Sequence, residues 1–182
     1  MRNAQIRRAA AADAAGIGAV HVASWQWAYR GQLPDHFLDT IDVHRRNEWW
    51  RRRLTNDPPI VVFVAERDGG IVGFCHVGPS DDTPESLLGE LHAIYLLETV
   101  ARQGIGSALM TAGLEALRDM AFDDAILWVL ASNEGTRRFY EQAGWLDDGG
   151  RQTYTLRDDV EAAAVRYRID LTTPNVNREA RR

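Results

Sequence analysis

The sequence contains a single cysteine, Cys75, so an internal disulfide is excluded and a reducing, cytoplasmic environment is expected. Cys75 lies in the apolar run 71–75, which predicts an inert core thiol rather than a nucleophile. No apolar run approaches the ~20 residues needed to cross a bilayer. The first eight residues show no apolar segment of the kind that signal peptides carry. We therefore expect a cytoplasmic protein with no membrane contact.

Metal-ligand clusters and a basic overall charge are also missing. The five histidines are scattered and Cys75 stands alone, so no metal site is expected. The net charge of −5 argues against nucleic acid as a partner, because nucleic acids favour basic surfaces, and it is compatible with a cationic amine substrate. One basic run on a predicted helix is interpreted as a solvated face: Arg45, Arg46, Arg51, Arg52 and Arg53.

The length of 182 residues fits one domain. No internal repeat or linker interrupts the pattern, so we predict a single domain over residues 1–171. Residues 172–182 have little to bury and are expected to form a flexible tail.

Apolar periodicity and the positions of Gly, Pro, Asp and Asn divide the chain into alternating strands and helices. The predicted elements are, in order, a strand at 5–9, a helix from Asp13 to about Tyr29, a helix capped by Asp35, a helix at 43–54, a hairpin of 60–65 and 71–77, a polar loop at 79–86, a strand at 88–97, a helix opening at Ile105, a strand at 125–131, a helix between Asn133 and Gly144, and strands at 152–156 and 165–171. This order indicates an α/β (α+β) fold with a mixed sheet and helices on both faces.

A glycine-bearing turn, Gly104-Ile105-Gly106, stands between a predicted strand and an amphipathic helix. The first N–H groups of a helix lack intrahelical partners and carry partial positive charge, which suits a pyrophosphate. Glycine lets ligand oxygens approach the backbone. The P-loop pattern is absent, and Leu109 stands where a dinucleotide fingerprint needs its third glycine. A Gly-x-Gly pair alone does not distinguish a phosphate site from a plain turn.

Residues 90–145 resemble the GNAT superfamily of acetyl-CoA-dependent N-acetyltransferases. That family carries a Gln/Arg-x-x-Gly-x-Gly/Ala loop after its fourth strand, followed by an Asn-containing turn and a helix with Phe-Tyr that ends in Gly-Phe. The counterparts here are 101–106, Asn133, Phe139-Tyr140 and Gly144-Trp145. The resemblance extends to 20–34 and to 165–167. It departs at Ala101, where the usual Gln or Arg is missing, so weaker cofactor binding is expected, with Arg102 and Gln103 as candidates to compensate.

The resemblance implies the GNAT fold, a mostly antiparallel sheet of six to seven strands whose central parallel strands splay apart. It implies direct transfer of an acetyl group from acetyl-CoA, the co-substrate, to an amine. Strand backbone would pair with the pantetheine arm, loop amides would hold the pyrophosphate, and an asparagine would contact the arm. The implied cofactor-binding residues are Ile94, Tyr95, Leu96, Arg102, Gln103, Gly104, Ile105, Gly106, Ser107, Asn133 and Tyr140.

Two residues carry the implied catalysis. Tyr140 matches the family's tyrosine that protonates the coenzyme A thiolate; on a helix it points about 100° away from Phe139, so the two are not expected to share the core. Glu90 lies where one branch of the family carries a glutamate base, and His92 shares its strand face. A solvated strand-end charge is the alternative for Glu90, and a packed edge histidine is favoured for His92. The glutamate of another branch is replaced by Trp128.

The acceptor is the least determined part. His21, Trp25 and Tyr29 recur at helical spacing, which is typical of a packing stripe. The resemblance places this helix at the acceptor wall, so Trp25, Tyr29 and His92 are candidate substrate contacts. A small amine is the first expectation, such as an antibiotic, a polyamine or an amino-acid derivative. A peptide or protein amine and a non-catalytic acyl-CoA-binding module stay open, as does a homodimer.

Overall fold

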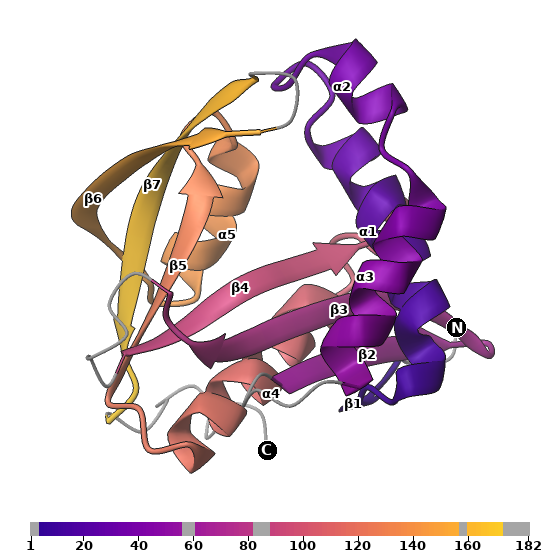
Figure 1. The fold of residues 1–182 in the computed structure, drawn as a ribbon. Coiled ribbons are helices and arrows are strands. Elements are labelled where there is room, and N and C mark those ends of the chain that lie inside the picture. The colour runs from indigo at the N-terminus through magenta and orange to yellow at the C-terminus, as the bar shows by residue number, and fades with distance from the viewer. Residues whose placement is uncertain (1–3, 56–60, 82–87, 157–159, 173–182) are drawn as a thin grey trace.

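A single seven-stranded sheet, in the order β1-β2-β3-β4-β5-β7-β6, organises the protein (Figure 1). The computed structural model describes residues 4–55, 61–81, 88–156 and 160–172. The strands are β1 Gln5–Arg8, β2 Val61–Arg67, β3 Gly70–Pro79, β4 Leu88–Leu96, β5 Asp124–Leu130, β6 Leu146–Thr155 and β7 Glu161–Asp170. Neighbouring strands are antiparallel except β4 and β5, which are parallel. The predicted fold class is confirmed.

Helices cover both faces of the sheet (Figure 1). They are α1 Ala14–Ala28, α2 Asp35–Asp39, α3 Val43–Thr55, α4 Ile105–Asp119 and α5 Glu134–Gln142, with short 3-10 turns η1 Ala11–Asp13 and η2 Glu98–Val100. α1 and α3 pack on one face, while α4 and α5 pack on the other. Across the described ranges, no helix is long and apolar enough to cross a membrane.

Alternation along β3 explains how one strand serves both layers. Phe74 points into the cluster formed with α1 and α3. The next residue, Cys75, points into the cluster beneath α4, where a Cβ added at Gly113 would lie 2.9 Å from its sulfur. Cys75 is fully buried, and this burial raises the pKa of its thiol. The prediction of an inert core cysteine is confirmed.

Three local predictions need correction. Asp13 precedes α1, but its carboxylate binds Arg7 at 2.7 Å and accepts from the Ala10 N–H at 2.7 Å instead of capping the helix. Asp35 is the first residue of α2, whose cap position is Pro34. β6 begins at Leu146 rather than at 152, because its Asp- and Gly-rich start forms a bulge against β7 instead of a turn. Most of the expected loop at 79–86 and of the expected tail lies outside the described residues.

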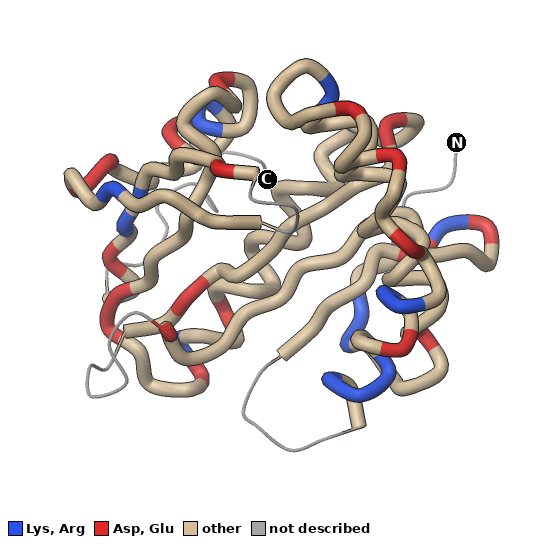
Figure 2. Tube along the Cα trace, turned by 45° about the horizontal axis from the view of Figure 1, so that its top comes forward, with Lys and Arg blue, Asp and Glu red and all other residues tan. Residues whose placement is uncertain are grey.

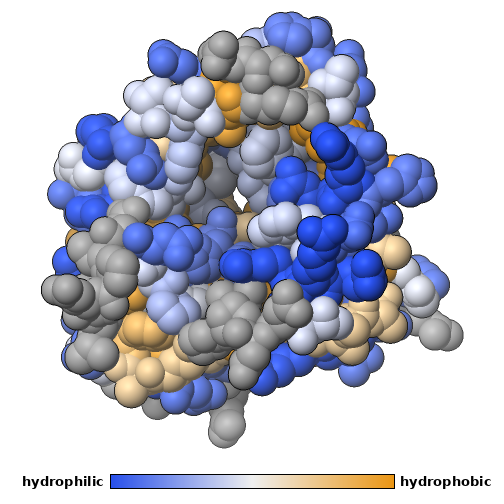
Figure 3. Space-filling model, viewed as in Figure 1, coloured by the Kyte–Doolittle hydropathy of each residue, from blue (hydrophilic) through white to orange (hydrophobic). Residues whose placement is uncertain are grey.

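The feature that creates a site is the separation of β4 from β5. Only Leu88–Glu90 pairs with its parallel neighbour, Asp124–Ile126. Beyond Glu90 the two strands diverge, and β5 continues beside β7 alone (Figure 1). A register shift opposite β3, where His76 pairs with Ala93 and Val77 with Leu91, leaves His92 as an extra residue at the start of the gap. The space-filling view shows a hollow between the two halves of this face (Figure 3).

Candidate active site

The backbone of β4 presents free polar groups to the gap. The Leu97 N–H donates to the Val72 carbonyl at 2.9 Å, and residues of an antiparallel strand alternate in the side to which they direct their N–H and C=O. Ile94 and Leu96 therefore direct theirs away from β3 and toward the gap, whereas Tyr95 directs its own toward Phe74. The Leu96 carbonyl already accepts from Ser24 Oγ at 2.7 Å. The Leu96 N–H and both groups of Ile94 face no described strand, because β5 pairs only with Leu88–Glu90, and they are available to a ligand.

At the far end of the gap, residues 102–107 form a row of backbone donors. Arg102 and Gly104 have positive φ angles of 58° and 81° and turn the chain into α4. The first bond of the helix runs from the Ala108 N–H to the Gly104 carbonyl at 3.1 Å. Across the described ranges, none of the six N–H groups from Arg102 to Ser107 has an acceptor. Unpartnered N–H groups at the start of a helix suit a pyrophosphate, so this segment fits coenzyme A.

The two glycines of this loop have different roles. Gly104 is needed for its left-handed backbone, since a Cβ there would meet open space. Gly106 keeps a passage open, because its Cβ would lie 3.4 Å from Leu96 and 3.5 Å from Phe139. Its missing side chain leaves room between β4 and α5, where an extended ligand arm would pass.

Two other predicted contacts are partly occupied. Gln103 accepts from Arg67 at 2.9 Å and donates to the Thr99 carbonyl at 3.1 Å, so it braces the loop and leaves Arg102 to compensate for Ala101. Asn133 caps α5 as predicted, with Oδ1 accepting from the Thr136 N–H at 3.2 Å. Its side-chain amide nitrogen makes no hydrogen bond within the described part of the chain.

Tyr140 lies in the core beneath α5. It is 6% exposed and packs at 5.3 Å from the Phe139 ring and 6.1 Å from the Trp145 ring. The expectation that Phe139 and Tyr140 cannot share the core is wrong, because two sides of α5 contact the same apolar cluster. The Tyr140 hydroxyl has no hydrogen bond to any described residue. Burial, together with Tyr95 and Cys75, raises its pKa well above that of a free phenol.

The aromatic residues along α1, His21, Trp25 and Tyr29, differ in how deeply they are buried. His21 is buried, stacks on Tyr95 at 5.1 Å and accepts from the Trp50 indole at 3.1 Å, and burial lowers its pKa to about 3. Tyr29 is half-buried, and its hydroxyl lies 3.2 Å from that of Tyr95. Burial raises the pKa of both phenols. The packing interpretation is right for His21, whereas Trp25 and Tyr29 are half-buried at the edge of the hydrophobic core.

Glu90 lies at the point where β4 and β5 part, and it is buried rather than solvated. Only 8% of it is exposed. One carboxylate oxygen accepts from Ser80 Oγ at 3.0 Å, and the other lies 3.3 Å from His92 Nδ1. His92 Nε2 lies 3.1 Å from the Pro79 carbonyl. The solvated alternative for Glu90 is wrong, and the predicted proximity of Glu90 and His92 is confirmed.

No sequence pattern predicts Ser80 as a partner of Glu90. It lies on the neighbouring chain segment after β3, and only the strand register brings it to the carboxylate. The same holds for His76, whose ring stacks on His92 at 4.7 Å.

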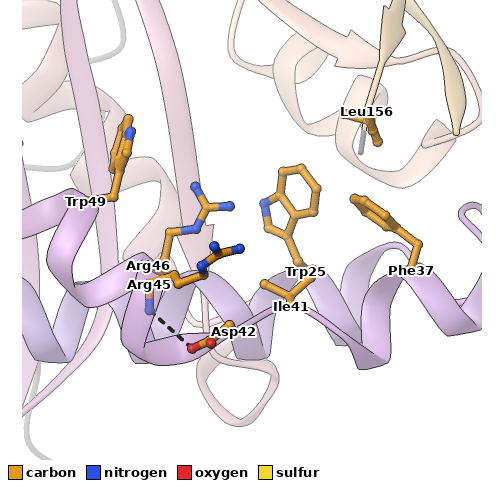
Figure 4. A pocket seen from close by; sticks show the side chains of 8 residues that line it. All are labelled: Trp25, Phe37, Ile41, Asp42, Arg45, Arg46, Trp49 and Leu156. Atoms are coloured by element: carbon orange, nitrogen blue, oxygen red, sulfur yellow. Dashed lines mark hydrogen bonds between the residues drawn. The ribbon is translucent and has the colours of Figure 1, made fainter. Parts of the chain in front are cut away.

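A groove of about 350 Å³ opens beside Trp25 (Figure 4). It is lined by Trp25, Phe37, Ile41, Asp42, Arg45, Arg46, Trp49 and Leu156. Its walls therefore come from α1, α2, the segment between α2 and α3, the first half of α3 and the residue after β6. Of the predicted substrate contacts, Trp25 lies in this groove, whereas Tyr29 and His92 do not line it.

Comparison with known proteins decides the family. The Acetyltransferase (GNAT) family profile matches residues 20–145. The chain belongs to the GNAT family. It is therefore an N-acetyltransferase with acetyl-CoA as its co-substrate, and the gap, the donor row and the open passage at Gly106 fit that co-substrate.

Individual relatives agree with this assignment. The uncharacterized N-acetyltransferase YuaI of Bacillus subtilis is 36% identical over 129 residues, covering 70% of this chain and 72% of the relative. A mycothiol acetyltransferase of Acidimicrobium ferrooxidans is 31% identical over 67% of this chain and 37% of its own length. The structure of yncA from Salmonella typhimurium with acetyl-CoA has a TM-score of 0.70 and 17% identity, covering 96% of this chain and 99% of that one.

Proposed function

We propose that this GNAT enzyme acetylates the primary amine of a small molecule, with Glu90 as the base and Tyr140 as the proton donor. The observation that carries the proposal is the burial of both groups: a carboxylate where the strands part, and a phenol beneath α5 whose hydroxyl makes no hydrogen bond to a described residue. The groove volume of about 350 Å³ supports a small acceptor, since ligand pockets begin at roughly 300 Å³. The similarity to a mycothiol acetyltransferase supports it too.

Each residue has a defined task. An amine must lose a proton to attack the acetyl carbon, and Glu90 accepts that proton directly or through a water. Ser80 and His92 hold the carboxylate in place. As the carbon–sulfur bond breaks, negative charge develops on sulfur, and the Tyr140 hydroxyl donates to it. Because burial raises the pKa of Tyr140, that hydroxyl keeps its proton until the thiolate forms.

Transfer is tested by following thiol release and the N-acetylated product with a panel of small amines and short peptides. The sequence contains no lysine, so acetyl-CoA is not consumed by acetylation of the enzyme's own side-chain amines. Product formation with small amines, and little with peptides, is the expected result. Turnover of peptides alone would overturn the small-molecule assignment, and product formation that survives both Glu90→Gln and Tyr140→Phe would overturn the roles given to these residues.

A further inference from the structure

Two arginines that line the groove have guanidinium groups that no described carboxylate contacts. Arg45 and Arg46 form no ion pair within the described part of the chain, although basic residues gather along α3 (Figure 2). Other arginines in those ranges are paired, including Arg7 with Asp13, Arg30 with Asp39, Arg52 with Glu48, Arg151 with Asp147 and Arg168 with Asp124. Arg46 is also half-buried, and this desolvation lowers its pKa. The Arg46 guanidinium lies 5.8 Å from the centre of the Trp49 ring, but a ring does not neutralise a partly buried cation, so the site favours an anion.

The acidic residue of the groove does not fill this role. Asp42 accepts from the backbone N–H groups of His44 at 2.7 Å and Arg45 at 3.1 Å, which caps α3. The dashed line in Figure 4 marks such a bond. The carboxylate is thereby held at the helix start and makes no ion pair with either guanidinium.

A third donor lies beside the two guanidinium groups. The Trp25 indole N–H is buried, and no described residue accepts a hydrogen bond from it in good geometry. Burial raises the pKa of the nearby Tyr95 hydroxyl, and the Trp25 N–H partly offsets that rise. In Figure 4 the indole nitrogen of Trp25 is on the side that faces Arg45 and Arg46. Donors from two helices therefore face one groove in which no described carboxylate contacts them, and this arrangement is the complement of an oxyanion.

This end of the groove adjoins the tyrosines at the gap. Trp25 lines the groove together with Arg46, and its ring lies 6.4 Å from the ring of Tyr95. The rings of Trp25 and Tyr29 are 5.1 Å apart, and the Tyr29 and Tyr95 hydroxyls are 3.2 Å apart. A ligand anchored at Arg46 would extend past these phenols toward the splayed strands. Phe37, Ile41 and Leu156 supply an apolar wall.

We propose that the acceptor is a small amine that carries an oxyanion, a carboxylate or a phosphonate, held by Arg45, Arg46 and the Trp25 N–H. The inference rests on the proposed N-acetyltransferase function and narrows its substrate class. Amino-acid-like compounds with an apolar side chain meet these conditions. Polyamines and aminoglycosides do not, because they would bring further cations to two arginines.

The test uses three sets of acceptors, with the side chains of leucine, methionine and phenylalanine. Each set contains the α-amino acid, its carboxamide, the decarboxylated amine and the phosphonate analogue of the acid. Coenzyme A release is measured with each. We expect kcat/KM for the acid or the phosphonate to exceed that for the amide at least tenfold. The comparison is conservative, because the amine of an amino amide loses its proton more readily than that of the acid.

The variant Arg46→Gln should lower kcat/KM for the anionic acceptor by about 10- to 100-fold through KM, the loss expected for a charge-assisted hydrogen bond, and leave the amide and the KM for acetyl-CoA unchanged. Arg52→Gln on the same helix, an exposed residue paired with Glu48, is the matched control and should change nothing. Turnover of amides or diamines in preference to acids would overturn the inference while the N-acetyltransferase function stands.

If no amine is acetylated, the proposed small-molecule function fails, and binding still tests the groove. Quenching of tryptophan fluorescence by the N-acetyl amino acid should be saturable and weakened by Arg46→Gln, because Trp25 and Trp49 line the groove. Equal quenching by the acid and its amide would overturn the anion site.

Discussion

His92 has its Nδ1 3.3 Å from Glu90 Oε1 and its Nε2 3.1 Å from the Pro79 carbonyl oxygen. A carbonyl oxygen only accepts, so Nε2 donates to Pro79, and this contact fixes the ring with Nδ1 toward the carboxylate. The two side chains therefore act as a unit at the point where β4 and β5 part. Glu90 also accepts from Ser80.

Replacing Glu90 by Gln removes the proposed base and keeps the shape of the side chain. We expect kcat/KM to fall by about 10²- to 10⁴-fold, the range for loss of a general base. The residual rate should rise steadily with pH, because a growing fraction of the substrate amine is already unprotonated and needs no base. Steady-state rates between pH 6 and 10 measure this, with Glu48→Gln, an exposed glutamate, as the control. A variant with wild-type rate and pH profile would remove Glu90 from the mechanism.

Tyr140→Phe deletes a hydroxyl that has no hydrogen bond to a described residue, so stability should change by less than about 1 kcal/mol. The rate should fall roughly 10- to 100-fold, with the affinity for acetyl-CoA retained. Because burial raises the pKa of Tyr140, the wild type should show no loss of rate from its ionisation up to pH ~10. Single-turnover rates and urea unfolding separate the two effects. A Phe variant as fast as wild type would leave Tyr140 a purely structural role.

The order of strands and helices was predictable because apolar periodicity reports which faces are buried. The start of β6 was not, since Asp147 to Gly150 have turn residues but form a bulge whose register is fixed by β7. Within the site, the donor row at 102–107 was expected from the loop pattern. The Ser80–Glu90 contact and the groove were not, because they join residues distant in sequence through tertiary packing.

Acid should destabilise the protein through two buried histidines. Burial lowers the pKa of His21 and of His76 to about 3, below the ordinary value near 6.5. The folded protein thus resists protonation that the unfolded chain accepts, so stability is present above pH ~6.5 and is lost as the pH falls toward 3. Each histidine should remove about 1.4 kcal/mol per pH unit in that window.

Urea unfolding at pH 7.5, 5.5 and 4.5 measures this slope. His76→Phe removes one titrating ring but keeps an aromatic beside Trp50 and His92, so the slope attributable to the histidines should be roughly halved. An unchanged slope in the variant would show that His76 is not a source of acid sensitivity.

Acetyl-CoA should bind at the N–H groups of residues 102–107, which have no acceptor among the described residues, and a thermal-shift titration measures this binding. Ser107 is exposed in the first turn of α4, where a glutamate favours the helix dipole but repels a pyrophosphate. Thr111→Glu, exposed one turn later, is the matched control. At acetyl-CoA near 100 Kd, binding adds about 2.7 kcal/mol, which should raise the Tm of wild type and Thr111→Glu by roughly 5–10 °C. Ser107→Glu should fold normally and show little shift. A shift in Ser107→Glu as large as that of the wild type, or no shift in the wild type at millimolar acetyl-CoA, would show that the co-substrate does not bind at this loop.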